Sequence, residues 1–482
     1  MVFEWSTMTA RVYPHLMPYI AGVDSSTQSV KVVIRDAQTG VLVREGRARH
    51  PAGTEVDPQH WWVALQEAIA QAGGMDDVSA ISIGGQQHGM VVLDSQGEVI
   101  RPALLWNDTR SAQQASDLNS EFGGDEAMAN AVGSVLVASF TASKVRWLAD
   151  NEPENADRVA AIALPHDWLS WKLTGSTDIK DLFTDRGDAS GTGYFDPVTS
   201  TYRRDILALA LRSEREIILP RILEPHQFGG KTVSGIPIAA GSGDNAAAAL
   251  GVGARPGDVV ISLGTSGTAF AVSQSPTNDP KGEVAGFADA TGRFLPLVCT
   301  LNAARILDAA ERILGVDHDR LGELALACEP GAGGLTLLPY FEGERTPNRP
   351  DATGVFAGMN LSNSHRENFA RGMIEGMLCG LVDAVESLIN LGVQVDRILL
   401  IGGAAKNPAV GEIASALFGR TVVLPPPGEY VADGAARQAA WALLGTEKAP
   451  EWPSGETVAF TSSPTPQVII NYRQLRDRTV GW

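Results

Sequence analysis

The chain has 482 residues, 44% of them hydrophobic and 20% charged, with a formal net charge of -18. This length predicts two domains rather than one core, and the composition is that of a folded globular protein. The acidic balance argues against nucleic acid or an anionic membrane surface as a partner.

The three cysteines are Cys299, Cys328 and Cys379. Their odd number and wide spacing predict neither a disulfide framework nor a zinc site, which fits a reducing cytoplasm. No apolar run approaches the roughly 18 residues of a membrane span. Residues 1–18 are expected to be an extension that lacks the apolar core of a signal peptide. We therefore expect a cytoplasmic protein with no membrane partner; a homodimer is one assembly that the sequence allows.

The first predicted element is a β-hairpin. Apolar runs at 19–23 and 30–34 flank residues 24–29, Asp-Ser-Ser-Thr-Gln-Ser, and two β-rich runs around a short polar turn are typical of a hairpin. Hydroxyls and backbone N–H groups in such a turn can hold an anion. Taken alone, the turn is better explained as an ordinary polar hairpin turn.

A helix over 61–72 and a buried strand over 80–83 follow. The strand ends in Gly-Gly-Gln-Gln-His-Gly at 84–89. Glycines on both sides of Gln87 and His88 indicate a bend that presents polar side chains. A turn with a helix cap would give the same pattern.

A second polar cluster lies at 106–110, Trp-Asn-Asp-Thr-Arg. Trp106 would offer an aromatic face to the carbon skeleton of a sugar, while Asn107 and Asp108 would meet its hydroxyls. A capped turn is an equally good explanation of this cluster by itself.

The next stretch alternates between helix and strand. Helices are predicted over 141–151 and 167–173, with a strand over 161–164 between them. Residues 185–193 are rich in Asp, Gly and Ser, a composition that predicts a loop.

Residues 241–245, Gly-Ser-Gly-Asp-Asn, join a strand over 236–240 to an alanine-rich helix. Asp244 would stand near the N-terminus of that helix, where a carboxylate can accept a proton from a bound hydroxyl. On this stretch alone, a role as helix N-cap is the better interpretation, because Asp is a favoured N-cap residue.

A second hairpin follows soon after. Apolar runs at 259–263 and 269–272 flank Gly-Thr-Ser-Gly-Thr, and placing Thr27 on Thr265 aligns the two hairpins as an internal repeat. Two related domains that face each other could grip a polyphosphate between two such turns.

Two later loops carry polar residues. A strand over 335–339 precedes Gly-Glu-Arg-Thr-Pro, in which we expect Arg345 to brace the loop rather than to contact substrate. A buried strand over 398–401 precedes Gly402 and Gly403. This turn leaves room for a flat ring such as a nucleotide base, although a plain turn between strand and helix explains it nearly as well.

The C-terminal helices are less distinctive. Residues 366–391 carry apolar side chains at successive i+4 positions, which predicts a helix with a core stripe. A helix is predicted to end near Leu417, and the proline-rich stretch up to Pro466 is expected to wrap over the surface.

From about residue 19 to residue 444, these motifs in this order resemble the FGGY carbohydrate kinases. Residues 139–151, with Lys144 and Trp147, are similar to a family signature. The pair Gln87–His88 and the segment 344–347 resemble the members that phosphorylate D-xylulose more than those that act on glycerol or gluconate.

The resemblance implies an α/β fold of two duplicated actin-like, ribonuclease-H-like ATPase domains with a cleft between them. Residues 19–245 would bind the sugar and carry the first phosphate hairpin. Residues 246–482 would bind ATP and carry the second.

The resemblance also implies transfer of the γ-phosphoryl group of ATP to the 5-hydroxyl of D-xylulose. Asp244 matches the family's proton acceptor, and Asp24 matches a catalytic aspartate that helps to place Mg²⁺, through water. The implied sugar contacts are Gln87, His88, Trp106, Asn107, Asp108 and Asn245. The implied ATP contacts are Thr27, Lys31, Gly264, Thr265, Asn302, Gly402, Gly403 and Asn407.

Some residues depart from the family pattern. Ser26 and Ser29 stand where the first turn often has glycine, and Gln86 or Gln87 stands where methionine is common. The sugar is therefore less firmly indicated than the reaction. A kinase of another pentulose or polyol, such as ribulose, is the alternative on the same scaffold.

An actin-like or chaperone-like nucleotide switch would share the two hairpins but would have no use for Gln87, His88 and Asp244 around a sugar pocket. A sugar-responsive DNA regulator is disfavoured by the net charge and by the lack of a basic helix-turn-helix segment.

Overall fold

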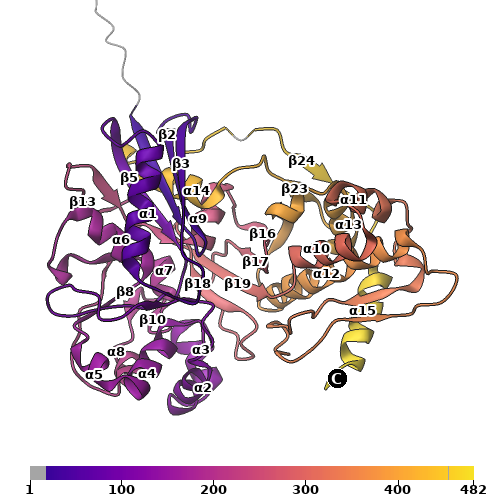
Figure 1. Ribbon diagram of the computed structural model, residues 1–482, viewed down its shortest axis with the longest axis horizontal. Coiled ribbons are helices and arrows are strands. Elements are labelled where there is room, and N and C mark those ends of the chain that lie inside the picture. Colours follow the sequence, from indigo (N-terminus) through magenta and orange to yellow (C-terminus); the bar gives the residue numbers. More distant parts are fainter. Residues whose placement is uncertain (1–17, 454, 482) are drawn as a thin grey trace, which may run out of the picture.

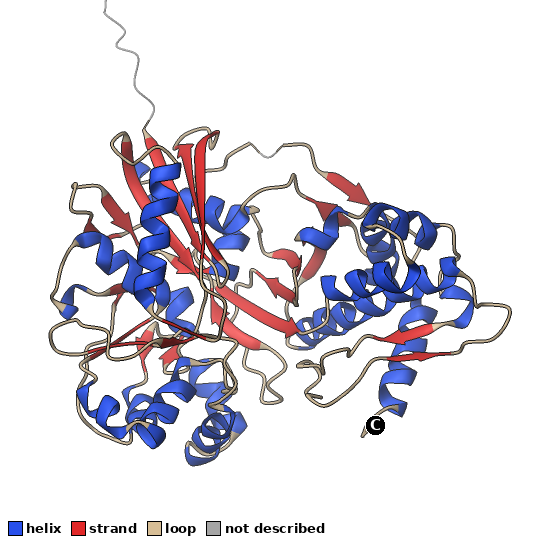
Figure 2. Cartoon of the chain, viewed as in Figure 1, coloured by secondary structure: helices blue, strands red, loops and turns tan. Residues whose placement is uncertain are grey.

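The computed structural model describes residues 18–453 and 455–481, so the predicted extension over 1–18 lies outside the described residues except for Pro18. The chain forms two lobes, one from each half of the sequence (Figure 1). Each lobe combines a mixed β-sheet with helices (Figure 2). Within the described residues, no helix is both long enough and apolar enough to cross a membrane.

The N-terminal sheet has seven strands, of which β15 (Ser242–Gly243) pairs with the end of β5. The other six run in the order β13 (Phe228–Lys231), β14 (Pro237–Ala239), β5 (Val78–Gly85), β1 (Tyr19–Ser25), β2 (Ser29–Asp36) and β3 (Leu42–Arg49).

The C-terminal sheet also has seven strands. Their order is β18 (Ala285–Ala288), β19 (Phe294–Thr300), β17 (Gly267–Ala271), β16 (Gly257–Leu263), β22 (Val395–Ile401), β23 (Val422–Leu424) and β24 (Val458–Phe460).

The two sheets share one topology, which confirms the predicted internal repeat. In the first, β1 is antiparallel to β2, β2 is antiparallel to β3, and β1 is parallel to β5. In the second, β16, β17, β19 and β22 take the same places in the same directions. Residues 26–28 and 264–266 separate the paired strands, so Thr27 and Thr265 occupy the middle of equivalent turns.

Short two-stranded pairings complete the strand set. They are β4 (Glu55–Val56) with β7 (Ala103–Leu104), β6 (Val91–Leu93) with β8 (Ala161–Ala163), β9 (Phe183–Asp185) with β12 (Arg221–Leu223), β10 (Phe195–Asp196) with β11 (Thr201–Tyr202), and β20 (Thr336–Leu338) with β21 (Val355–Ala357).

Nine α-helices of the described chain come before the second hairpin. They are α1 (Pro58–Gln71), α2 (Ala112–Glu121), α3 (Asp125–Val132), α4 (Thr141–Asn151), α5 (Pro153–Arg158), α6 (Pro165–Thr174), α7 (Arg186–Ser190), α8 (Arg204–Leu211) and α9 (Asp244–Gly251). The later ones are α10 (Ala304–Leu314), α11 (His318–Leu326), α12 (Arg366–Asn390), α13 (Pro408–Phe418), α14 (Tyr430–Leu444) and α15 (Pro466–Arg478).

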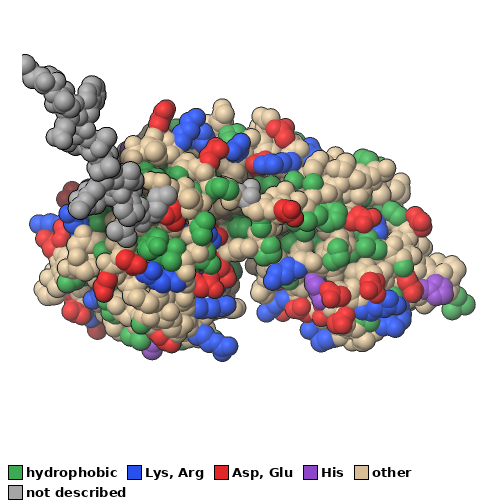
Figure 3. All heavy atoms as spheres, turned by 90° about the horizontal axis from the view of Figure 1, so that it is seen from above, with side chains coloured by type: hydrophobic (Ala, Val, Ile, Leu, Met, Phe, Trp, Pro, Cys, Tyr) green, Lys and Arg blue, Asp and Glu red, His purple; other side chains and the backbone are tan. Residues whose placement is uncertain are grey.

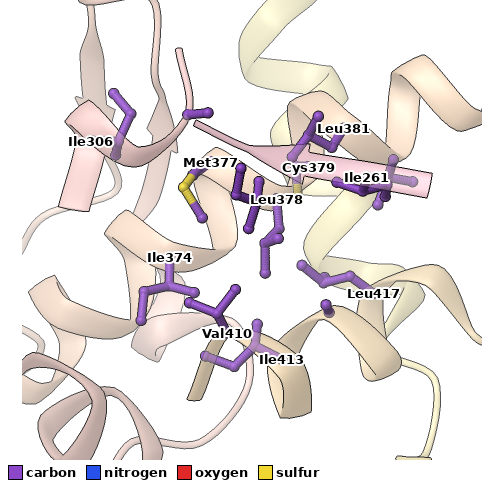
Figure 4. Close-up of a cluster of buried hydrophobic side chains, with 14 of the residues drawn as sticks. Ile261, Ile306, Ile374, Met377, Leu378, Cys379, Leu381, Val410, Ile413 and Leu417 are labelled. Atoms are coloured by element: carbon purple, nitrogen blue, oxygen red, sulfur yellow. The ribbon is translucent and has the colours of Figure 1, made fainter. Parts of the chain in front are cut away.

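The core of the C-terminal lobe confirms the predicted stripe on α12. Met377 and Leu381 of α12 pack with Val410 and Ile413 of α13 and with Ile261 of β16 (Figure 4). All five are at most 1% exposed, and burial of such side chains supplies most of the stability of a helix in a protein.

Helix α14 joins the two halves of the chain. Its residues Ala432, Ala436 and Ala439 pack against Ile20 and Ala80 of the N-terminal sheet. Figure 1 accordingly shows α14, in the orange of the late sequence, among indigo strands. On another side α14 packs closely against α9, the helix that begins with Asp244.

One prediction was wrong and another was incomplete. The loop expected over 185–193 contains α7, because the Asp185 side chain accepts hydrogen bonds from the N–H groups of Gly187 and Asp188 and caps a short helix. The proline-rich stretch expected to wrap over the surface is mostly exposed and also contains β24, which pairs with β23 at the edge of the C-terminal sheet. Helix α15 after it was not predicted.

Candidate active site

Two aspartates lie at the same end of the N-terminal sheet. Asp24 of β1 is paired with Gly84 of β5, and Ser242 of β15 is paired with the same Gly84 from the other side. Two strand spacings put Asp24 about 10 Å from the turn that leads into Asp244. The negative charge of Asp244 helps to raise the pKa of Asp24, so the two carboxylates face one region.

Asp244 does not cap helix α9. The N-cap is Gly243, and Asp244 is the first helical residue, so the simple capping interpretation is wrong. Its Oδ1 accepts hydrogen bonds from the backbone N–H and from the Nδ2 of Asn245, both at 2.8 Å. Burial raises the pKa of Asp244 to about 6, although these two hydrogen bonds oppose the shift. Above that pH the carboxylate is a better base than an ordinary aspartate.

Asp24 has a free coordination position. It is 5% exposed, and its Oδ1 has no hydrogen-bond partner. Its Oδ2 lies 3.8 Å from Nζ of Lys31, which also forms an ion pair with Glu429. Burial raises the pKa of Asp24 to about 7, against the effect of Lys31. A buried, unpartnered carboxylate oxygen fits a hydrated Mg²⁺, which prefers oxygen ligands.

The bend after β5 presents Gln87 and His88 as predicted. Gln87 Nε2 donates to the carbonyl oxygen of Gly187 at 3.3 Å, and His88 Nδ1 lies 2.6 Å from that of Gly191. Burial lowers the pKa of His88 to about 3, so the ring is neutral. Since a carbonyl oxygen only accepts, Nδ1 carries the proton and Nε2 is left as an acceptor.

The first hairpin turn meets both polar clusters. Trp106 Nε1 donates to Oγ1 of Thr27 at 2.8 Å, and Thr27 Oγ1 donates to Oε1 of Gln86 at 3.4 Å. Three segments far apart in sequence therefore converge. Asn107 lies beside them, and its Oδ1 is buried without a hydrogen-bond partner.

Three other predicted contacts have their polar atoms engaged within the protein. Asp108 accepts hydrogen bonds from Thr54 and Arg110. Asn302 donates to the carbonyl oxygen of Gly343 and to Glu344, and Asn407 caps α13. The structure gives all three a bracing position, and their contacts with a ligand stay predictions.

The nucleotide-side residues form an exposed backbone surface. Pairing of β16 with β22 puts Gly402 next to the turn that holds Gly264 and Thr265. A Cβ at Gly402, where φ is +98°, would lie 2.5 Å from the carbonyl oxygen of Leu263, whereas a Cβ at Gly403 would meet nothing within 4 Å. The two turns therefore touch, with open space above Gly403. Figure 3 shows the molecule hollowed between its two lobes.

The side chain of Arg345, which was predicted to brace its loop, reaches across to the other half of the chain. Its Nη2 lies 3.5 Å from Oγ of Ser139 in the other half of the chain. After burial, its positive charge is among the causes that lower the pKa of His88 and that of Lys144, the latter to about 7. Arg345 thus faces the sugar-side cluster. Ser139 is 206 positions away, so the sequence carries no signal for this approach.

Comparison with known proteins gives a consistent result. Residues 19–251 match the N-terminal domain of the FGGY family of carbohydrate kinases, and residues 259–443 match its C-terminal domain. The chain is 45% identical over 450 residues to "Xylulose kinase" of Streptomyces coelicolor, covering 90% of this chain and 89% of that one. It is 42% identical to "Xylulose kinase" of Streptomyces rubiginosus, covering 96% and 95%.

Solved structures extend the comparison. The crystal structure of xylulose kinase from Bifidobacterium adolescentis superposes with a TM-score of 0.90 at 50% identity and covers 96% of this chain and 100% of that one. Plasmodium falciparum glycerol kinase shares the fold at 20% identity and a TM-score of 0.85. With two duplicated α/β domains of the actin-like ATPase type and both family domains matched in order, this chain belongs to the FGGY family of carbohydrate kinases.

Proposed function

We propose that this enzyme transfers the γ-phosphoryl group of ATP to the 5-hydroxyl of D-xylulose, giving D-xylulose 5-phosphate, with Asp244 as the general base. The observation that carries the proposal is the pair of carboxylates, buried Asp24 and half-buried Asp244, on both sides of the end of β5. The relatives named xylulose kinase, at 42% and 45% identity, support the choice of sugar.

Phosphoryl transfer requires positioning and charge stabilisation more than covalent chemistry. Asp244 would hydrogen-bond the sugar hydroxyl and take its proton as the new O–P bond forms. Asn245 holds Oδ1 of Asp244 with two hydrogen bonds, which leaves the other oxygen for the hydroxyl. General-base help of this kind is worth about 10²–10⁴-fold.

The phosphates would lie between the two hairpin turns. Backbone N–H groups of 27–28 and 264–266 would bind phosphate oxygens, as turns of this kind do, while the N–H of Ser26 donates to the carbonyl oxygen of Ser29 within the turn. Asp24 would hold Mg²⁺ through water with its unpartnered Oδ1, and the ion, when bound, neutralises phosphate charge. Lys31 pairs with both Asp24 and Glu429, so its single positive charge offsets part of the negative charge that the anionic nucleotide would meet here.

The sugar would lie against the bend and the Trp106 cluster. Neutral His88 offers Nε2 as an acceptor for a sugar hydroxyl, and the indole of Trp106 is fixed by Thr27. Closure of the lobes, divided at 245/246, would exclude water from the γ-phosphate. Cytoplasmic location and a homodimer remain predictions.

A coupled ADP-release assay across D-xylulose, D-ribulose, L-ribulose, glycerol and gluconate tests the proposal. We expect the highest kcat/KM with D-xylulose, and mass spectrometry should identify the 5-phosphate. A preference for another sugar would overturn the substrate while leaving a kinase. Fast ATP hydrolysis that no sugar accelerates would instead favour the nucleotide switch.

A further inference from the structure

A buried ionic cluster lies directly behind the proposed sugar pocket. His166 at the start of α6 is 0% exposed, and its Nε2 lies 3.1 Å from Oδ2 of Asp188, 3.3 Å from Oδ1 of Asp167 and 3.4 Å from Oδ1 of Asp185. Within residues 18–453 and 455–481, no lysine or arginine forms an ion pair with these carboxylates. The imidazole is therefore the group that can balance their charge.

The surroundings favour the protonated ring. Burial alone would lower the pKa of His166, but the charges of Asp167 and Asp188 outweigh it and raise the pKa well above its usual value. The separations of 3.1–3.4 Å put the ring within ion-pair distance of the three carboxyl groups, and Nε2 makes no direct hydrogen bond to them. The ring is thus a cation surrounded by three acids, and burial raises the pKa of two of these acids, Asp167 and Asp188.

This cluster anchors the helix that holds the sugar bend. Asp185 caps α7 and Asp188 lies within it. These two of the three partners of His166 therefore fix the position of α7. The carbonyl oxygens of Gly187 and Gly191, at the two ends of the same segment, hold Gln87 and His88. A displacement of α7 would therefore move both side chains.

The same ring also supports the turn that carries the base. A Cβ added at Gly85 would lie 2.9 Å from Cβ of His166, and one added at Gly241 would lie 2.6 Å from its Nδ1. Gly241 opens the turn that ends in Asp244. The imidazole therefore fills the space beneath the end of β5, α7 and this turn.

We infer that His166 is a positioning residue for sugar phosphorylation, whose imidazolium holds α7 and the turn at 241–243 so that Gln87, His88 and Asp244 converge on one substrate. This rests on the proposed function, because that proposal places the sugar in this pocket. His166 itself is buried and acts through the groups it holds.

Two substitutions separate charge from bulk. His166→Gln keeps most of the volume and removes the cation, and we expect kcat/KM for D-xylulose to fall about 10- to 100-fold, the scale of a small misplacement of reacting groups. The KM for ATP should stay unchanged, since Gly264 and Gly402 follow strands of the C-terminal sheet, whereas the cluster lies on α6 and α7 of the N-terminal half. His166→Lys restores a positive charge and should recover most of the loss.

Leu169→Ala is the matched control, on the same helix and 0% exposed. It lowers stability through a cavity without removing charge. If Leu169→Ala lowers sugar kcat/KM as much as His166→Gln at a similar fall in Tm, or if His166→Lys restores nothing, the inference is overturned.

Wild-type ¹⁵N NMR gives a readout that does not depend on activity. At pH 8 both ring nitrogens of His166, assigned by their absence in His166→Lys, should be protonated. A neutral ring, or a divalent metal that elemental analysis finds in the wild type but not in His166→Gln, would overturn the inference. If no sugar in the panel is phosphorylated, the proposed function fails, whereas the NMR result still decides the state of His166.

Discussion

At the scale of single residues, Asp244 is the clearest test of mechanism. Its carboxylate is held by Asn245 and is partly withdrawn from solvent. Asp244→Asn keeps the shape and removes the base, so we expect kcat to fall about 10²–10⁴-fold while the KM values for sugar and ATP change little. Steady-state kinetics measure this. The control is the far-UV circular dichroism and Tm of the variant, which should match wild type; a near-normal kcat would disprove the role.

The raised pKa of Asp244 also predicts the acid limb of the pH profile. A base must be ionised, so activity is lost as the pH falls through about 6, rather than near the ordinary value of 3.8. Asp24, whose pKa is raised to about 7, would also take up a proton in this range. The measurement is therefore kcat at saturating Mg²⁺, so that weaker Mg²⁺ binding by protonated Asp24 does not contribute to the acid limb. Asn245→Ala keeps the backbone N–H bond but removes the side-chain hydrogen bond from Nδ2, which lowers the pKa of Asp244, so the acid limb of this variant should move to higher pH. If the acid limb of Asn245→Ala lies at the same pH as that of the wild type, the assignment of this limb to Asp244 is wrong.

Residues with local signals were easier to predict than residues with distant partners. Asp24, Asp244, Gln87 and His88 follow strand ends in the sequence, and the structure places each in the region expected of it. Asn302 and Arg345 were different, because their partners Glu344 and Ser139 lie 42 and 206 positions away. Only the tertiary fold shows that the first is engaged in the protein and the second faces the sugar side.

At the scale of elements, the sequence predicted strands and long helices well. The helices at 141–151 and 366–391 appear within one residue of the expected bounds, and the strands of the two hairpins within two residues. Helix α7 was missed because five residues are too few to show a helical period. Its stability comes from the Asp185 cap and the His166 cluster, neither of which a composition rich in Gly and Ser reveals.

Helix α14 gives the element-scale prediction. A Cβ at Gly434 would lie 1.8 Å from the carbonyl oxygen of Ala247 in α9, so Gly434→Ala forces the two helices apart. We expect it to cost about 1–3 kcal/mol of unfolding free energy, as overpacking does, and to lower kcat, because α9 begins with Asp244. Urea unfolding and sugar kinetics measure both.

The matched control is a second glycine inside a helix. Gly380 of α12 has open surroundings, since its nearest neighbour to an added Cβ is Oη of Tyr472 at 3.6 Å. Gly380→Ala should therefore be neutral or stabilising by about 0.5–1 kcal/mol, the gain in helix propensity. Equal destabilisation by both substitutions would show that close packing of α14 on α9 is not the cause.

At the scale of the whole molecule, the two lobes share packing beneath the proposed site. Met90 and Leu104 of the N-terminal half lie in one buried cluster with Val260, Phe270 and Leu399 of the C-terminal sheet. Phe287, also from the C-terminal half, lies with its ring centroid 5.7 Å from that of His88. The groups proposed to bind sugar and those proposed to bind ATP are thus connected by shared packing. A relative movement of the two lobes would therefore change the distance between these two sets of groups.

Closure of the lobes is the last prediction. Water and a sugar hydroxyl are similar nucleophiles, so a kinase that left the γ-phosphate open would hydrolyse ATP. If the sugar bridges the His88 cluster and Asp244, it favours the closed arrangement, because it binds that arrangement more tightly. ATP hydrolysis without sugar should then be slower than phosphorylation by about 10²-fold or more, the cost of a misplaced nucleophile.

Small-angle X-ray scattering should show a smaller radius of gyration with D-xylulose than without it. In Asp244→Asn, which keeps the pocket but not the base, the sugar should still produce this contraction while phosphorylation is lost, so closure and chemistry are tested separately. Contraction that needs only ATP, or none with any ligand, would contradict sugar-driven closure.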